Sequence, residues 1–160
     1  MNCLFDKFHY FRDEENFLFT WKVTGKIEIS EIHPIVDTIK VNVMSLPKGN
    51  AKLLVDNRQM VDNDNHPILF SSAINMEWIK LQQWLLEYCS LVAVLCGSRL
   101  MQAQMDRIAE NSGLSQILCT FWSKKNDESL LEAAKFLKIE SSIVSQLLGF
   151  DPKIINIESN

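Results

Sequence analysis

The sequence has no long hydrophobic run, no internal repeat and no low-complexity tract. No apolar stretch among its 160 residues approaches the roughly 20 residues that a membrane-spanning helix requires. The opening residues, from Met1 to Asp6, do not have the composition of a signal peptide. We therefore expect one soluble, cytoplasmic protein without a membrane span.

The charge of the chain is small, and its cysteines are scattered. The net charge is −4, from 16 basic and 20 acidic residues, and the basic residues form no stripe, so we expect no nucleic-acid partner. The four cysteines contain no Cys-x-x-Cys pair, and Cys96 and Cys119 fall in apolar runs. We expect the thiols to pack as small apolar groups, with no metal and no cofactor.

Three sequence motifs that are common in enzymes are also missing. There is no Gly-x-Ser-x-Gly nucleophile elbow, no Walker phosphate loop and no Gly-x-Gly-x-x-Gly fingerprint. We therefore expect a protein that is not an enzyme.

Short apolar runs alternate with amphipathic stretches between residues 53 and 137. The runs at 53–55, 91–96 and 116–121 are unbroken, as in strands that are buried on both faces, and apolar residues recur at helical spacing between them. We expect the run at 91–96 to be a central strand, parallel to its two neighbours. With 47% hydrophobic residues, the chain can bury a core, and the pattern predicts a single α/β domain.

The N-terminal part of the chain predicts an antiparallel hairpin followed by a helix. Two aromatic-rich runs, at 4–11 and 17–23, are separated by a polar turn of the length that joins antiparallel strands. Apolar residues then recur every three or four positions over 29–43, with Ser30 as the expected cap and Pro34 in the first turn. The sheet should therefore be mixed but mostly parallel, with four to five covering helices.

Three further helices are expected after the parallel strands. Ser71 or Ser72 caps the first, Gly113 ends the second, and acidic residues at 127 and 128 begin the third. The residues expected to face the core are Ile74, Trp78, Leu81, Leu85 and Tyr88 in the first helix, Leu100, Met101, Met105, Ile108 and Ala109 in the second, and Leu130, Leu131, Ala134 and Leu137 in the third.

A long polar loop, residues 56–67, is predicted after the first parallel strand. Loops at the carboxyl ends of parallel strands are where α/β proteins carry function. Asp62, Asp64 and His66 alternate within it as calcium ligands do, but a proline follows His66 where glycine is required, and Ala73 stands at the glutamate position. We expect a solvated loop and no metal.

Two helix starts present groups that suit either structure or an anion. Gly97, Ser98 and Arg99 follow a buried strand and open a helix, where backbone N–H groups and a guanidinium can meet an anion. A turn of this kind also needs a small residue and a cap for structure alone. Ser71 and Ser72 likewise offer hydroxyls that either cap their helix or accept a phosphate, which the helix dipole would favour.

Two local motifs and the order of the elements carry a family resemblance. Residues 105–114 form a helix that ends in a Ser-Gly-Leu turn, and residues 126–133 open a helix with acidic residues. These features, with the order hairpin, helix and three strand–helix units, resemble the STAS domain of bacterial anti-sigma-factor antagonists over residues 17–137. An Asp-Ser-Ser-Gly motif carries the phosphorylated serine in that family. Residues 70–73 are the nearest match and lack the aspartate and the glycine.

The resemblance implies a non-enzymatic regulatory domain that binds a protein, an anti-sigma factor or a kinase, with Ser72 and Ser71 as phosphorylation candidates. Its surface would comprise residues 62–72, 97–99 and 124–127, which should converge at the carboxyl ends of the strands. The alternative is a protein similar to the STAS/SEC14-like family, which would bind a lipid or a small apolar ligand between the sheet and the aromatic second helix.

We expect one STAS-like domain at residues 1–138, followed by an amphipathic helix and tail at residues 139–160. Ile139, Ile143, Leu147 and Phe150 form an apolar stripe there. We expect this stripe either to cover the domain's own sheet or to form a homodimer face.

Overall fold

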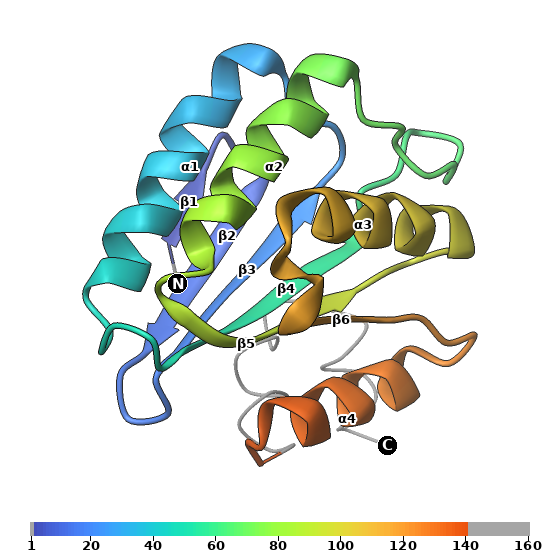
Figure 1. Cartoon of the computed structure of the whole chain (residues 1–160). Coiled ribbons are helices and arrows are strands. Elements are labelled where there is room, and N and C mark those ends of the chain that lie inside the picture. The colour runs from blue at the N-terminus through green and yellow to red at the C-terminus, as the bar shows by residue number, and fades with distance from the viewer. Residues whose placement is uncertain (1, 141–160) are drawn as a thin grey trace.

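The computed structural model describes residues 2–140 as a mixed six-stranded sheet with helices on both faces (Figure 1). The strands follow one another across the sheet in sequence order, the first three antiparallel and β3 to β6 parallel. The predicted α/β fold is therefore confirmed. The strands are β1 (Asn2–Leu4), β2 (Phe8–Asp13), β3 (Leu18–Thr24), β4 (Ala51–Gln59), β5 (Cys89–Leu95) and β6 (Leu118–Phe121).

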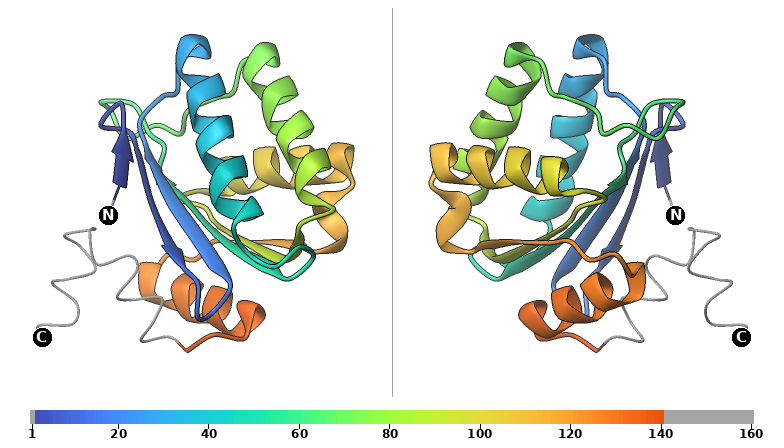
Figure 2. Two further views of the ribbon diagram at one scale, coloured as in Figure 1. Left: turned by 90° about the vertical axis from the view of Figure 1, so that its left-hand side faces the viewer. Right: turned by 90° about the vertical axis from the view of Figure 1, so that its right-hand side faces the viewer.

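Four α-helices lie within the described residues: α1 (Ile29–Met44), α2 (Ser72–Leu85), α3 (Arg99–Ser112) and α4 (Asn126–Leu137). The helices α1, α2 and α3 cover one face of the sheet, and α4 covers the other (Figure 2). Right-handed crossovers between strands that add in one direction place their helices on one face. Helix α4 leads to no further strand within the described residues, so the handedness rule does not determine which face of the sheet it covers. None of these helices is long and apolar enough to cross a membrane.

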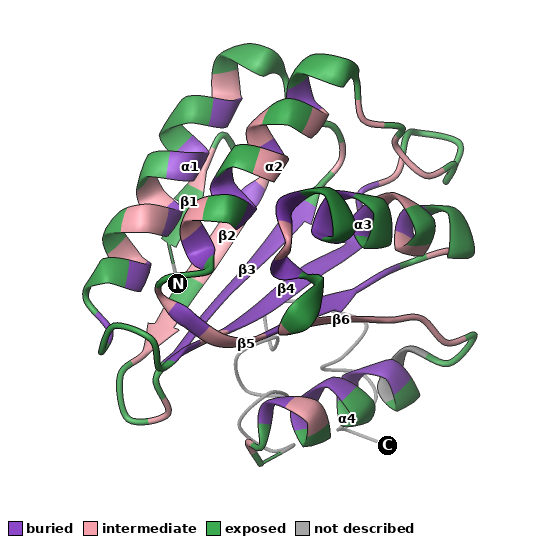
Figure 3. Cartoon of the chain, viewed as in Figure 1, coloured by how far each residue is buried: buried purple, intermediate pink, exposed green. Residues whose placement is uncertain are grey.

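The prediction of a central strand at 91–96 is confirmed. Strand β5 pairs in parallel with both β4 and β6, and alternate residues enter two different cores. Val92 and Val94 pack in the larger core under α1 to α3, whereas Ala93 and Leu95 pack in the smaller core against α4. Figure 3 shows the resulting burial of the central strands and the partial exposure of β6.

The prediction of one continuous strand over 4–11 is wrong. Phe5 and Asp6 adopt positive φ angles of 57° and 54°, and the Lys7 N–H donates to the Leu4 carbonyl at 3.1 Å, which closes a turn. This turn divides the segment into β1 and β2. Aspartate tolerates the left-handed region better than most residues, but the segment has no glycine or proline that would mark the turn in the sequence.

The expected start of α1 is also wrong. Its N-cap is Glu28 rather than Ser30, and Glu28 and Glu31 form a capping box in which the Glu28 N–H donates to Glu31 Oε1 at 2.8 Å. Because the helix begins at Ile29, Pro34 lies in the second turn rather than the first. There its ring removes one backbone hydrogen bond of the helix.

Strand β4 is longer than predicted, so the polar loop begins later than residue 56. Asp56 and Arg58 are 0% and 7% exposed. They share one face of the strand because side chains alternate. Arg58 donates from Nε and Nη2 to the two carboxylate oxygens of Asp56, at 2.9 Å each. The two buried charges therefore neutralise each other within the strand. The loop between β4 and α2 occupies residues 60–71.

Three expected core positions differ in the structure. Leu100 and Leu131 are 48% and 54% exposed, because the buried stripes of α3 and α4 run through other positions of those helices. Tyr88 lies beyond the end of α2, where it packs, partly buried, against the larger core. The both-face burial predicted for the third run fails as well, since β6 is an edge strand and Cys119 is partly exposed.

The C-terminal stripe lies mostly outside the described residues. Ile143, Leu147 and Phe150 belong to the part that the structure does not describe, so the alternatives of sheet cover and homodimer stay predictions. Ile139 is described, and it packs, partly buried, against the smaller core.

Candidate interaction surface

The segments that follow β4, β5 and β6 lie on one edge of the sheet (Figure 1). The guanidinium of Arg99, in the predicted segment 97–99, lies over the ring of Trp122, 4.4 Å from its centroid. Trp122 directly follows β6 and precedes the predicted segment 124–127. No hydrogen bond or ion pair of the described residues joins the side chains of Asp62, Asp64 or His66 to residues 97–99. The predicted convergence therefore holds for the edge as a whole, but not for contacts between its polar side chains.

Gly97 and Ser98 have structural roles at the start of α3. A β-carbon placed on Gly97 would lie 2.6 Å from the carbonyl oxygen of Arg58, so only glycine lets the end of β5 approach the end of β4. The hydroxyl of Ser98 accepts the N–H of Met101 at 3.1 Å and caps α3. With the ring of Trp122 beneath Arg99, all three residues of this segment are engaged within the fold.

The structure gives the two serines at the start of α2 different environments. Ser71 is the N-cap, and its hydroxyl accepts the N–H of Ile74 at 3.3 Å, which confirms the predicted cap. Ser72 is the first residue of the helix and is exposed, and its hydroxyl makes no hydrogen bond to any residue in the described range. Lys26 and Ser71 line the same surface pocket of about 140 Å³. Both serines are exposed, and Ser72 is the one of the pair whose hydroxyl is not engaged in capping the helix.

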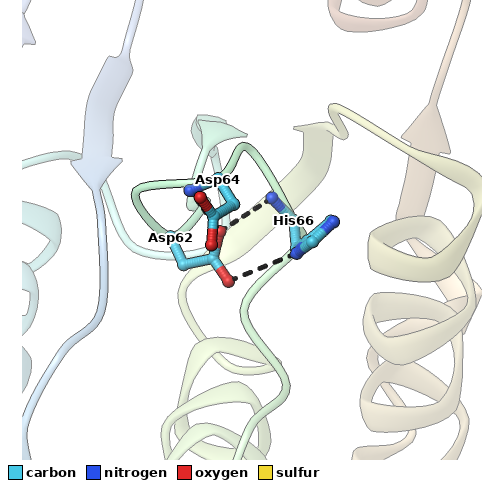
Figure 4. Close-up of side chains that lie close together, drawn as sticks. All are labelled: Asp62, Asp64 and His66. Carbon is cyan, nitrogen blue, oxygen red and sulfur yellow. Dashed lines mark hydrogen bonds and ion pairs between the residues drawn. The ribbon is translucent and has the colours of Figure 1, made fainter.

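The loop side chains Asp62, Asp64 and His66 gather at one point (Figure 4). Asp62 Oδ1 accepts the backbone N–H groups of Asp64 and His66, both at 2.9 Å, and Asp62 Oδ2 lies 3.7 Å from His66 Nδ1. The hydrogen bond from the His66 N–H holds the pKa of the Asp62 carboxyl below its usual value. Two carboxylates and an imidazole are a donor set for a divalent cation, but these bonds give Asp62 a sufficient role in closing the loop.

A surface groove of about 320 Å³ separates α2 from α3. Its apolar lining includes Leu69 and Leu100, which are 66% and 48% exposed. Gln104 fixes the adjoining loop, because its Oε1 accepts the Phe70 N–H at 2.9 Å and its Nε2 donates to the Ile68 carbonyl at 3.0 Å. Leu69 belongs to the predicted surface segment 62–72, whereas Leu100 and Gln104 are absent from the predicted surface. The available signal was the apolar run at 68–70 inside a loop.

An interior cavity of about 40 Å³ lies between the sheet and α2. Its lining is mainly apolar and includes Trp21, Trp78 and Met105, with the amides of Asn57 and Gln82. This is where the apolar-ligand alternative places its site. Pockets for small ligands are usually about 300–1,000 Å³, so the cavity as it stands does not accommodate a lipid chain.

The thiols are poorly suited to nucleophilic chemistry. Burial raises the pKa of Cys89 and of Cys96 to about 12, so both are protonated at neutral pH. Burial, with the nearby Asp106, also raises the pKa of Cys119. On the exposed hairpin, Cys3 Sγ lies 3.8 Å from His9 Nε2. Neither residue lines the groove, the surface pocket beside Ser71 or the interior cavity. Trp78 and Met105 are buried and, as expected, belong to the core.

Comparison of the chain with protein-family models, with curated proteins and with solved structures gives no match.

Proposed function

We propose that this protein is a cytoplasmic, non-enzymatic regulatory domain of STAS-like type, which acts by binding another protein at the carboxyl edge of its sheet. The observation that carries the proposal is the pairing of Ser72 with Leu69. An exposed hydroxyl without a hydrogen bond in the described part of the chain lies three residues from a leucine that is 66% exposed, at the start of one helix. The leucine would contribute apolar surface that contacts the partner, and phosphorylation of the serine would regulate that contact.

The arrangement of elements supports the STAS-like assignment. Along the chain, antiparallel strands and a helix precede three strand–helix units, which is the order of elements on which the resemblance rests. The serine pair opens α2, the helix that connects the parallel strands β4 and β5, and it is the nearest match to the motif in which the antagonists carry their phosphorylated serine. On this reading the partner is an anti-sigma factor or a kinase.

Phosphorylation of Ser72 would change the charge of this surface without disrupting the helix. A phosphate adds a charge of about −1.5 to −2 at neutral pH, and at the first position of α2 it would lie at the positive end of the helix dipole. Lys26, on the pocket that Ser71 lines, adds a cation nearby. An acidic partner surface would then be repelled while the domain itself stays folded.

The size of the interior cavity favours this proposal over an apolar-ligand carrier. At about 40 Å³ the cavity is far smaller than the pockets that hold such ligands. Binding of a lipid would require α2 to separate from the sheet, at the cost of contacts made by Trp78, Leu81 and Leu85.

Site-specific photo-crosslinking in the native host tests the proposal. We expect p-benzoylphenylalanine at position 69 to form a covalent adduct with one partner protein, and the same probe at Leu131, on the opposite face of the molecule, to form none. With the probe at 69, Ser72→Asp should reduce the adduct several-fold, whereas Ser72→Ala should preserve it. Absence of an adduct at 69, or equal adducts at both positions, would refute the binding surface. An adduct that is unchanged by Ser72→Asp would refute the switch.

A further inference from the structure

We infer that the groove between α2 and α3 binds a short apolar segment of the partner that carries an aspartate or glutamate. This inference rests on the proposed function and adds the chemistry of the partner. It follows from three properties of the groove: its apolar walls, its fixed shape and its one cation.

The groove exposes apolar surface on both of its sides. Leu69 and Phe70 approach it from the loop before α2, and Leu100 comes from the first turn of α3. Exposed leucines are unremarkable singly. Leu69 and Leu100, however, line the same groove of about 320 Å³, and burying them against an apolar partner would release ordered water.

The shape of the groove is set before anything binds. Gln104, on α3, holds the loop by two hydrogen bonds to main-chain groups at positions 68 and 70. These two hydrogen bonds hold the loop that carries Leu69 against α3. A site that is already formed avoids part of the entropic cost of ordering on binding.

Arg107 decides the charge of the occupant. It is the one charged side chain among the described residues that line the groove, where its polar neighbours are the amides of Asn75, Gln104 and Asn111. No ion pair or hydrogen bond of the described residues engages its guanidinium. A guanidinium binds a carboxylate through two parallel hydrogen bonds. The complementary ligand is therefore apolar with one acidic side chain, and a basic segment would be disfavoured.

Peptide display against the full chain provides the test. A library of random peptides is selected on the wild-type protein and counter-selected on Leu100→Asp. We expect the enriched peptides to combine apolar residues with an aspartate or glutamate. One enriched peptide is then synthesised with a fluorescent label, and its affinity for each variant is measured by anisotropy.

The variants are matched so that each has its own control. Leu100→Asp should weaken binding at least tenfold, whereas Leu131→Asp, at a leucine of similar exposure on the opposite face of the molecule, should leave it unchanged. Arg107→Gln should weaken binding several-fold, and Arg107→Glu should shift the selection toward basic peptides. The thermal melting of each variant is recorded, so that loss of fold is not read as loss of binding.

Three outcomes would overturn the inference. The first is an enriched set that is neutral or basic and insensitive to Arg107, and the second is no enrichment over Leu100→Asp. The third is a concentration-dependent dimer in sedimentation that Leu100→Asp abolishes, which would assign the groove to a second copy of the chain. A photo-adduct at position 69 alongside the first outcome would leave the proposed function standing and reject only the acidic partner. Alongside the second outcome it would also leave the proposed function standing, and would reject the groove as the binding site.

Discussion

Replacing Gly97 by alanine has opposite predicted effects on stability, according to whether the close approach of β5 to β4 is rigid. At an unstrained position, glycine to alanine stabilises a protein by about 0.4–1 kcal/mol, because the unfolded chain loses freedom. Gly97 is not among the glycines with positive φ, so its backbone accommodates alanine. The added β-carbon would nevertheless lie 2.6 Å from the Arg58 carbonyl oxygen.

That contact should decide the sign. The obstacle is backbone rather than the end of a flexible side chain, and the strand that carries it is held by the buried pair of Arg58 and Asp56. Overpacking of this kind costs about 1–3 kcal/mol. After the gain in the unfolded state is subtracted, we expect a net loss of about 1–2 kcal/mol in the free energy of unfolding. For a domain of this size, the loss lowers the melting temperature by about 2–4 °C per kcal/mol.

Urea denaturation of wild type and Gly97→Ala, followed by circular dichroism, measures this loss as a shift of the midpoint at constant slope. Gly25→Ala provides a comparison, since nothing lies within 4 Å of its added carbon but its φ of +72° strains alanine. A Gly97→Ala protein that is as stable as wild type, or more stable, would refute the rigid approach of the two strands. The structural role assigned to Gly97 would then fail, and a role in binding would regain weight.

Two further predictions concern helix starts. Ser71→Ala should lower the free energy of unfolding by about 0.5–2 kcal/mol, because it removes the acceptor of the Ile74 N–H, whereas Ser72→Ala should change it by no more than about 0.5 kcal/mol; urea melts that gave both variants the same loss would contradict this division. For Glu31, partial burial raises the pKa, but the hydrogen bond from the Glu28 N–H and the ion pair with Lys7 outweigh it and leave the pKa below its ordinary value of 4.5. A carboxyl group whose pKa is lowered in the folded state stabilises the fold above its ordinary pKa, and that contribution is lost as the pH falls through the folded value. The melting-temperature difference between wild type and Glu31→Gln should therefore be larger at pH 7 than at pH 3, and a difference independent of pH would count against the capping box.

The parallel part of the sheet is predictable from sequence because its signals are local. Residues 91–96 form an unbroken apolar run between two helices with clear ends, and Ser98 and Gly113 cap the second of these as their chemistry predicts. Strand ends are less predictable where polar side chains are paired within the strand. Asp56 and Arg58 indicate a loop when taken singly, and only their bidentate contact in three dimensions makes their burial favourable.

The groove could not be predicted, for a different reason. Leu100 directly precedes the buried Met101, so its sequence position alone places it at the margin of the apolar stripe of α3. Whether such a margin is covered depends on how closely α2 approaches α3, which is a property of packing rather than of spacing. Arg107 carries no sequence signal either, because an arginine on an amphipathic helix is usually solvated. Arg107 becomes a candidate binding residue only because it lines the same groove as the exposed Leu69 and Leu100.

The separation of Ser71 from Ser72 bears directly on how a phosphate would act. If Ser71 were modified, the hydroxyl that accepts the Ile74 N–H would be replaced by a larger dianion at the cap, and the start of α2 would have to rearrange. A modification of Ser72 leaves that cap in place, because its side chain makes no hydrogen bond within the described part of the chain. The new charge would then act on whatever approaches Leu69 and the groove beyond it. An acidic segment drawn in by Arg107 is the occupant that a phosphate at this edge repels most strongly, so the proposed switch and the inferred chemistry of the partner require the same sign of charge.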